Sequence, residues 1–225
     1  MRTDIRHDPS FAVARCFIDR GQTINIESGA MAAQSLGIKI EAKMQGGLFG
    51  ALKRSIMSGD SFFVSKFSAD PNHDGWVDVA PAYPGDVASL EVPPNGLTLT
   101  RGAWLASDLS VNLDPAVNPR MFLGGEGIFT VSCTGKGTVV ISAYGALDSH
   151  SLGPGEGMTI DTGHLVAYET GMQVNIRKAG TGFINSLTSG EGLVMDIYGP
   201  GDVLTQTRNP TAFAGFIRNL LPSNN

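Results

Sequence analysis

The chain is short of charge, cysteine and long apolar runs, and each shortage argues against a class of protein. Charged residues make up only 16% of its 225 residues, and the formal net charge of −5 argues against nucleic-acid binding, which needs a basic surface. Two cysteines are too few for a disulfide framework. No apolar run is long enough to span a bilayer, and the N-terminus lacks the apolar core of a signal peptide. We therefore expect a cytoplasmic protein with reduced thiols.

Glycine is abundant, at 29 residues, and the sequence repeats itself. Residues 21–33 resemble residues 155–167 at a constant offset, and residues 97–106 form a third, intermediate copy. A second motif, in which glycine and an acidic residue precede an apolar run, recurs in the second half of each unit. Its three occurrences are residues 58–63, 124–129 and 189–194. These patterns predict three repeat units followed by a tail, with boundaries at 11–92, 93–150, 151–208 and 209–225.

The repeated segments have the alternation of half-buried strands, and glycine or proline interrupts them every few residues. This spacing predicts an all-β sandwich or barrel in each unit. One face of a strand is buried, so the apolar residues of equivalent strands should all point into the core. These residues are Ile24, Ile26, Leu97, Leu99, Met158 and Ile160.

Two segments depart from the β pattern. Residues 46–59 have apolar side chains at helical spacing, and the C-terminal segment is a clearer amphipathic helix. There, Asn209 is a candidate N-cap and Pro210 a candidate first helical residue. The apolar stripe that follows comprises Phe213, Phe216, Ile217, Leu220 and Leu221. A short helix needs packing for stability, so we expect this stripe to lie against the β body, with a second subunit or a membrane as alternatives.

Four segments resemble the altered-inheritance-of-mitochondria (mitochondrial biogenesis) family: residues 44–54, 81–85, 124–127 and 161–168. The resemblance extends from about residue 11 to residue 218. It implies a fold like that of the tryptophan RNA-binding attenuation protein. Each unit would then be a β-sandwich or short double-stranded β-helix, and the units would surround a pseudo-threefold axis. The resemblance implies no particular activity, because a fold does not determine a function.

Few residues suggest chemistry. The glycine-rich strings lack the Lys-Ser/Thr of a phosphate-binding loop, and the histidines lack zinc-ligand spacing, so we expect no cofactor and no metal. Asp161 and His164 form the best local pair, although a polar turn that bonds to the backbone is the favoured interpretation. The acidic residues of the second motif would form a ring around a threefold axis and could bind a cation, but capping of turns is favoured there too. These residues are Asp60, Glu126 and Glu191.

These observations favour a non-catalytic binding or scaffold protein that engages a protein partner or assembles with itself. Leu48 and Phe49 are candidate docking residues. Peripheral membrane contact is less favoured, because two cations beside them attract anionic lipid only weakly. The alternative is a small-ligand or metal-binding protein, or an enzyme, with its site between the repeat units. RNA binding is less favoured because the chain is acidic and lacks a repeated basic and aromatic pattern.

Overall fold

The computed structural model describes residues 1–43, 64–100, 102–117, 129–178 and 193–221. The described chain consists of antiparallel strands with one α-helix, α3, and a short 3₁₀ helix, η2. The predicted all-β class with a C-terminal helix is confirmed. The predicted helical segment at 46–59 lies outside the described residues.

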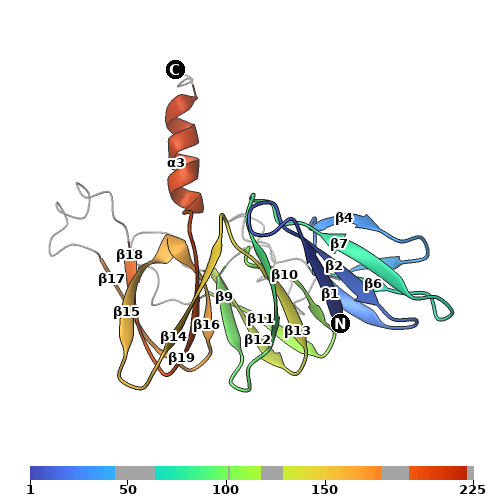
Figure 1. The fold of residues 1–225 in the computed structure, drawn as a ribbon, viewed down its shortest axis with the longest axis horizontal. Helices are drawn as coiled ribbons and strands as arrows, with labels where there is room; N and C mark the ends of the chain where they lie inside the picture. Colours follow the sequence, from blue (N-terminus) through green and yellow to red (C-terminus); the bar gives the residue numbers. More distant parts are fainter. Residues whose placement is uncertain (44–63, 101, 118–128, 179–192, 222–225) are drawn as a thin grey trace.

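The strands form four sheets, two at the ends of the molecule and two between them (Figure 1). The first end sheet has the order β1 (Arg2–Arg6), β2 (Val13–Ile18), β7 (Gly75–Val79), β4 (Met31–Gln34). The first middle sheet has the order β5 (Lys39–Lys43), β6 (Val64–Ser68), β3 (Thr23–Glu27), β10 (Trp104–Asp108), β13 (Thr138–Ser142), β8 (Val87–Glu91). The second middle sheet has the order β11 (Val111–Val117), β12 (Phe129–Gly135), β9 (Leu97–Thr100), β16 (Leu165–Glu169), β19 (Gly201–Gln206), β14 (Leu147–Leu152). The last end sheet has the order β15 (Gly157–Asp161), β18 (Leu193–Tyr198), β17 (Gln173–Lys178).

The order of strand pairing recurs along the chain. In each of three consecutive stretches, the first and third strands pair with the sixth, and the second and fourth pair with the fifth. The three stretches, β2–β7, β8–β13 and β14–β19, lie in a row in Figure 1. Arrangement of the units around a pseudo-threefold axis stays a prediction, as do the unit boundaries. The attenuation-protein-like fold is likewise untested.

Each middle sheet is shared between two neighbouring stretches. Strand β3 pairs with β10, and β9 pairs with β16, so the sheet of one stretch continues into the next. The two middle sheets therefore link the three stretches, although the four sheets are not hydrogen-bonded to one another through any described strand. This sharing, rather than a linker, joins the stretches to each other.

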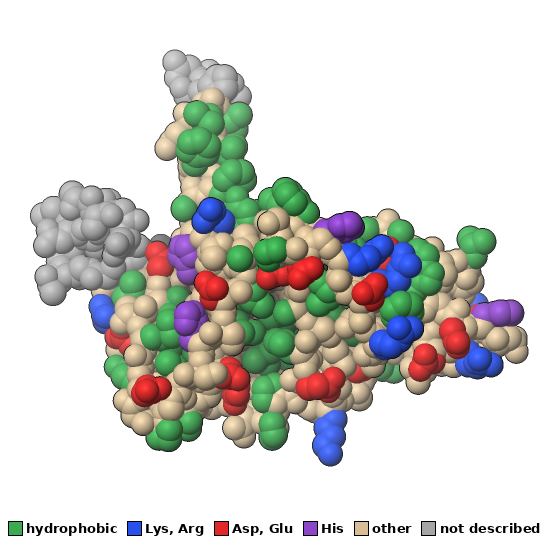
Figure 2. All heavy atoms as spheres, viewed as in Figure 1, with side chains coloured by type: hydrophobic (Ala, Val, Ile, Leu, Met, Phe, Trp, Pro, Cys, Tyr) green, Lys and Arg blue, Asp and Glu red, His purple; other side chains and the backbone are tan. Residues whose placement is uncertain are grey.

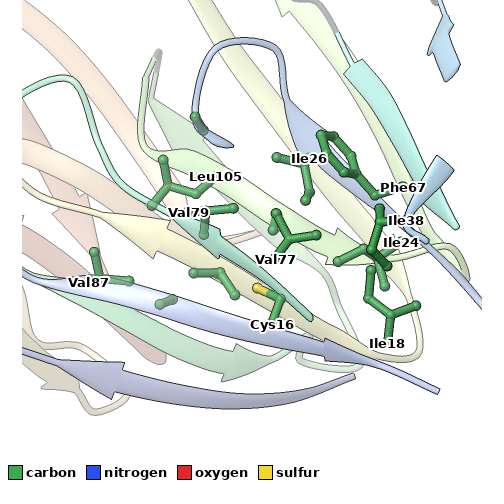
Figure 3. Close-up of a cluster of buried hydrophobic side chains, with 14 of the residues drawn as sticks. Cys16, Ile18, Ile24, Ile26, Ile38, Phe67, Val77, Val79, Val87 and Leu105 are labelled. Atoms are coloured by element: carbon green, nitrogen blue, oxygen red, sulfur yellow. The ribbon is translucent and has the colours of Figure 1, made fainter. Parts of the chain in front are cut away.

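The core comprises three clusters of buried apolar side chains, one of which is drawn in Figure 3. That cluster contains the predicted inward residues Ile24 and Ile26, and the other clusters contain Leu97, Leu99 and Ile160. The prediction is confirmed for these five residues. The sixth, Met158 on the edge strand β15, is only partly buried.

Helix α3 (Pro210–Leu220) begins as predicted. The Asn209 side-chain oxygen accepts hydrogen bonds from the amides of Thr211 and Ala212, at 2.9 and 3.1 Å. The expected packing against the β body is wrong: α3 stands out from the body and has no buried residue (Figure 1). In the described parts of the chain, the aromatic contact of α3 with the body is at the base of the helix, where Phe213 meets Tyr144. Among the described residues, no helix is long and apolar enough to cross a membrane.

Candidate functional site

A small hollow of about 110 Å³ lies beside the start of α3, where residues from all three stretches meet. Its wall combines aromatic rings with a few polar groups, a mixture typical of small-ligand sites. The wall includes Glu27, Tyr83, Thr100, Ser142, Tyr144 and Gln206. The hollow therefore lies between the predicted units, where the sequence analysis placed its alternative ligand site.

Glu27 is the only acidic residue in the described lining of the hollow, and it ends strand β3. The chain turns immediately after it: the amide of Ala30 donates to the Glu27 carbonyl at 3.1 Å, and Gly29 has a φ of 96°. Burial raises the pKa of the Glu27 carboxyl to about 7. A carboxyl with that pKa can donate or accept a proton near neutral pH.

Tyr83 and Tyr144 supply the aromatic wall. Their ring centroids are 5.2 Å apart, and Phe213 of α3 extends the stack with its centroid 5.7 Å from Tyr144. The backbone beneath is held closely, because a Cβ on Gly85 would collide with the carbonyl of Ala143. A hollow whose wall contains a carboxyl and two tyrosine rings can hold a small organic cation when the carboxyl is ionised.

Gln206 fixes the part of the rim nearest α3. Its side-chain oxygen accepts from the Tyr144 amide at 2.8 Å, and its side-chain nitrogen donates to the Gly163 carbonyl at 3.0 Å. The Gln206 backbone carbonyl accepts at 2.7 Å from Nδ1 of His164. A carbonyl cannot donate, so Nδ1 carries the proton in this contact.

The predicted pair Asp161 and His164 thus bonds to the backbone. Asp161 precedes η2 (Thr162–His164), and its carboxylate accepts from the Gly163 amide at 2.8 Å. His164 is engaged by Gln206 as described, and no contact between Asp161 and His164 is found. These contacts support the favoured interpretation of a polar turn.

The other predicted site residues lie outside the described parts of the chain: Asp60, Glu126, Glu191, Leu48 and Phe49. The acidic ring and the docking segment therefore stay predictions. Within the described ranges, no group of three or more His, Cys, Asp or Glu side chains is arranged to hold a metal ion.

Comparison with known proteins places the chain in a family. The family model described as mitochondrial biogenesis AIM24 matches residues 3–208. The chain belongs to this family. The resemblance seen in the sequence is thereby confirmed.

Two streptococcal proteins resemble this AIM24-family chain over nearly their whole length. An uncharacterized protein of Streptococcus pyogenes serotype M6 is 29% identical to it, across 99% of this chain and 92% of the relative. The crystal structure of a second Streptococcus pyogenes protein, from a structural genomics consortium, has a TM-score of 0.82 at 29% identity. That match covers 98% of this chain and 99% of the streptococcal one.

The sequence analysis did not identify Glu27 as a site residue of this AIM24-family chain. Strand alternation places it on the outward face, away from Ile24 and Ile26, where solvation is the ordinary expectation. It shares the wall of the hollow with Tyr83 and Tyr144, which lie far along the chain. One signal was present: Glu27 is the counterpart of Asp161 in the aligned repeats, so acidic side chains end both strands.

Proposed function

We propose that this chain is a non-catalytic scaffold protein that binds a protein partner through α3. The observation that carries the proposal is the exposure of the apolar stripe of α3. Phe216 and Leu220 are 59% and 65% exposed, respectively, and Leu221, the C-cap residue, is 64% exposed. Figure 2 shows apolar side chains along much of the projecting helix. Adjacent large apolar side chains on a surface commonly mark an interaction site.

The N-terminal end of α3 is fixed to the β body, and the side chains along the rest of the helix are not buried. The Asn209 side chain caps it and packs on Gly163, where a Cβ would collide with the Asn209 amide. A helix of this length is marginal in water without packing, so a partner that covers the stripe would also stabilise the helix. An apolar groove is the surface that accepts such a helix, and the stripe supplies the anchors.

A protein groove fits α3 better than a lipid surface does. Arg218 is the single charged side chain of the helix. Amphipathic helices that bind anionic lipid carry several cations on the polar face, which α3 lacks. The β body beneath it acts as the rigid base from which the helix is displayed.

The test places a photo-crosslinking amino acid at position 220 in the full-length protein, expressed in its native cells. We expect a covalent adduct with another protein. The adduct should be lost in the Phe216→Asp variant and kept in a matched control, Phe11→Asp, whose side chain is 71% exposed elsewhere on the body. Crosslinks only to lipid, or only within the same chain, would overturn the proposal.

The hollow supports a second candidate function, the binding of a small organic cation. The supporting observation is the half-buried Glu27 carboxyl in the same wall as the Tyr83 and Tyr144 rings. Tetramethylammonium is a suitable probe, because it has the charge and is small. We expect it to perturb tyrosine NMR signals at pH 8 and much less at pH 5.5, where Glu27 is protonated. Equal perturbation in the Glu27→Gln variant would contradict this candidate.

A further inference from the structure

Each end of the molecule has an edge strand that lacks a second neighbour among the described strands, and these two strands are complementary to each other. Strand β4 pairs only with β7, and β15 pairs only with β18, among the described strands. In Figure 1 these strands lie at opposite ends of the molecule, β4 at the right and β15 at the left. Each is the counterpart of a strand that joins two stretches inside the chain.

The strand pairings establish which residues correspond. Strands β4, β10 and β16 each have a register shift at the same place, immediately before Ala33, Ala106 and Ala167, respectively. Likewise, β3, β9 and β15 pair with β6, β12 and β18 in one common way. The strand β4 therefore corresponds to β10 and β16, and β15 corresponds to β3 and β9.

The two internal junctions have the same side-chain pattern. At the first junction the facing pairs are Ile26–Ala106, Asn25–Ser107 and Ile24–Asp108. At the second they are Leu99–Ala167, Thr98–Tyr168 and Leu97–Glu169. In both, a large aliphatic residue faces alanine, a polar pair follows, and a large aliphatic residue then faces a polar one.

The free strands β15 and β4 carry the same pattern. Aligned in the register of the internal junctions, Ile160 faces Ala33, Thr159 faces Gln34 and Met158 faces Ser35. Alanine again lies opposite the large aliphatic residue, and the polar pair again follows it. The third pair differs only in that serine takes the place of the acidic residue.

Residues of the free strands are more exposed than their counterparts at the internal junctions. Ala106 and Ala167 are fully buried at the internal junctions, whereas their counterpart Ala33 is exposed. Met31 is 39% exposed, although its counterparts Trp104 and Leu165 are buried. On the other strand, Thr159 is exposed.

Of the edge strands in the described sheets, β4 is the least protected, and β15 is protected no better than β8. Exposed edges usually carry charge or proline, which hinder pairing with another chain. The other six edges follow this rule to differing degrees: β1, β5, β11 and β17 carry residues such as Asp4, Lys39, Pro115 and Arg177, whereas β8 and β14 each carry one acidic residue, Glu91 and Asp148. Strand β4 contains no charged residue and no proline, and β15 contains one charged residue, at its end.

We propose that β4 of one copy, extended by the adjoining Ser35, pairs antiparallel with β15 of a second copy, in the register Ala33–Ile160, Gln34–Thr159, Ser35–Met158. The new junction joins the two end sheets into one, β1-β2-β7-β4 followed by β15-β18-β17, with the strand order of the internal junctions. The contact is head-to-tail, so each copy keeps one free end. Repetition of it produces a closed ring or a growing filament. This surface is separate from α3.

Engineered cysteines test the register directly. The amide of Ser35 donates to Trp76 of β7, so the amide of its neighbour Gln34 points away from the body. Directly opposed residues in such a pair have Cα atoms about 5.5 Å apart, within reach of a disulfide. The native cysteines, Cys16 and Cys133, are buried and do not interfere.

Under mild oxidation, we expect the Gln34→Cys/Thr159→Cys protein to form a ladder of covalent oligomers. A mixture of the two single variants should give one heterodimer band. Each single variant alone should form no covalent oligomer, and neither should the control Gln34→Cys/Ser151→Cys, whose second cysteine lies on β14 instead of β15. Dimers of Gln34→Cys alone would show symmetric β4–β4 pairing and overturn the proposal.

Sedimentation of the unmodified protein gives an independent measurement. We expect species larger than the 23.6 kDa monomer, reduced to the monomer by Ala33→Lys, which places a charge on an exposed edge position. Circular dichroism verifies that this variant is folded, and Thr3→Lys on the β1 edge serves as its matched control. A wild-type chain that is monomeric at every soluble concentration, or an extended peptide of another protein as the native occupant of β4, would overturn the proposal.

Discussion

At the scale of single residues, Glu27 couples stability to pH. Its pKa is raised from 4.5 to about 7, so between these values the folded protein holds a proton that the unfolded chain releases. The contribution of the Glu27 carboxyl to the free energy of unfolding is therefore fully present below pH 4.5 and is lost as the pH rises through 7. The loss is at most about 1.4 kcal/mol per pH unit in that window.

The Glu27→Gln variant removes this dependence, because glutamine resembles the protonated carboxyl. We expect its melting temperature to match that of the wild type near pH 4.5 and to exceed it increasingly toward pH 8. Glu41→Gln, at an exposed site on β5, should show no such divergence. Parallel melting profiles for wild type and Glu27→Gln would contradict the buried carboxyl.

At the scale of elements, α3 should contribute little to the stability of the isolated chain. Its contact with the body is the Phe213–Tyr144 ring pair, and such pairs are worth about 0.5–1.5 kcal/mol. Deletion of residues 210–225 should lower the free energy of unfolding by no more than that. Chemical denaturation checks this, with Leu99→Ala in the fully buried core as a positive control that costs about 2–5 kcal/mol. A loss as large as that of the control would mean that the helix packs in cis.

The elements themselves could be predicted well from local pattern. Alternation identified the strand at 23–27 and the inward direction of Ile24 and Ile26, and the Asn209-Pro210 pair identified the start of the helix. The surroundings of each element could not be predicted in this way. An apolar stripe shows that a helix needs a partner, but its sequence is the same whether the partner is the chain's own sheet or another molecule.

At the scale of the whole molecule, the all-β class and the family followed from motifs spread along the chain. The junctions between stretches did not, because they pair strands such as β3 and β10 that are far apart in sequence. The hollow depends on the same long-range contacts, since Glu27, Tyr144 and Gln206 come from three different stretches. Periodicity predicts a strand from its own residues, whereas pairing depends on which edges the rest of the fold leaves open.

The shared middle sheets restrict how such a protein can evolve. Strand β10 belongs by sequence to the second stretch, yet it completes a sheet with β3 of the first. A stretch removed from the chain would leave an uncovered edge on each neighbour, so it is not a portable module. Gene duplication or loss can preserve solubility only when every new edge finds a strand of the same kind. If the middle stretch were lost, for example, the sheets could be completed only by β16 taking the place of β10 beside β3.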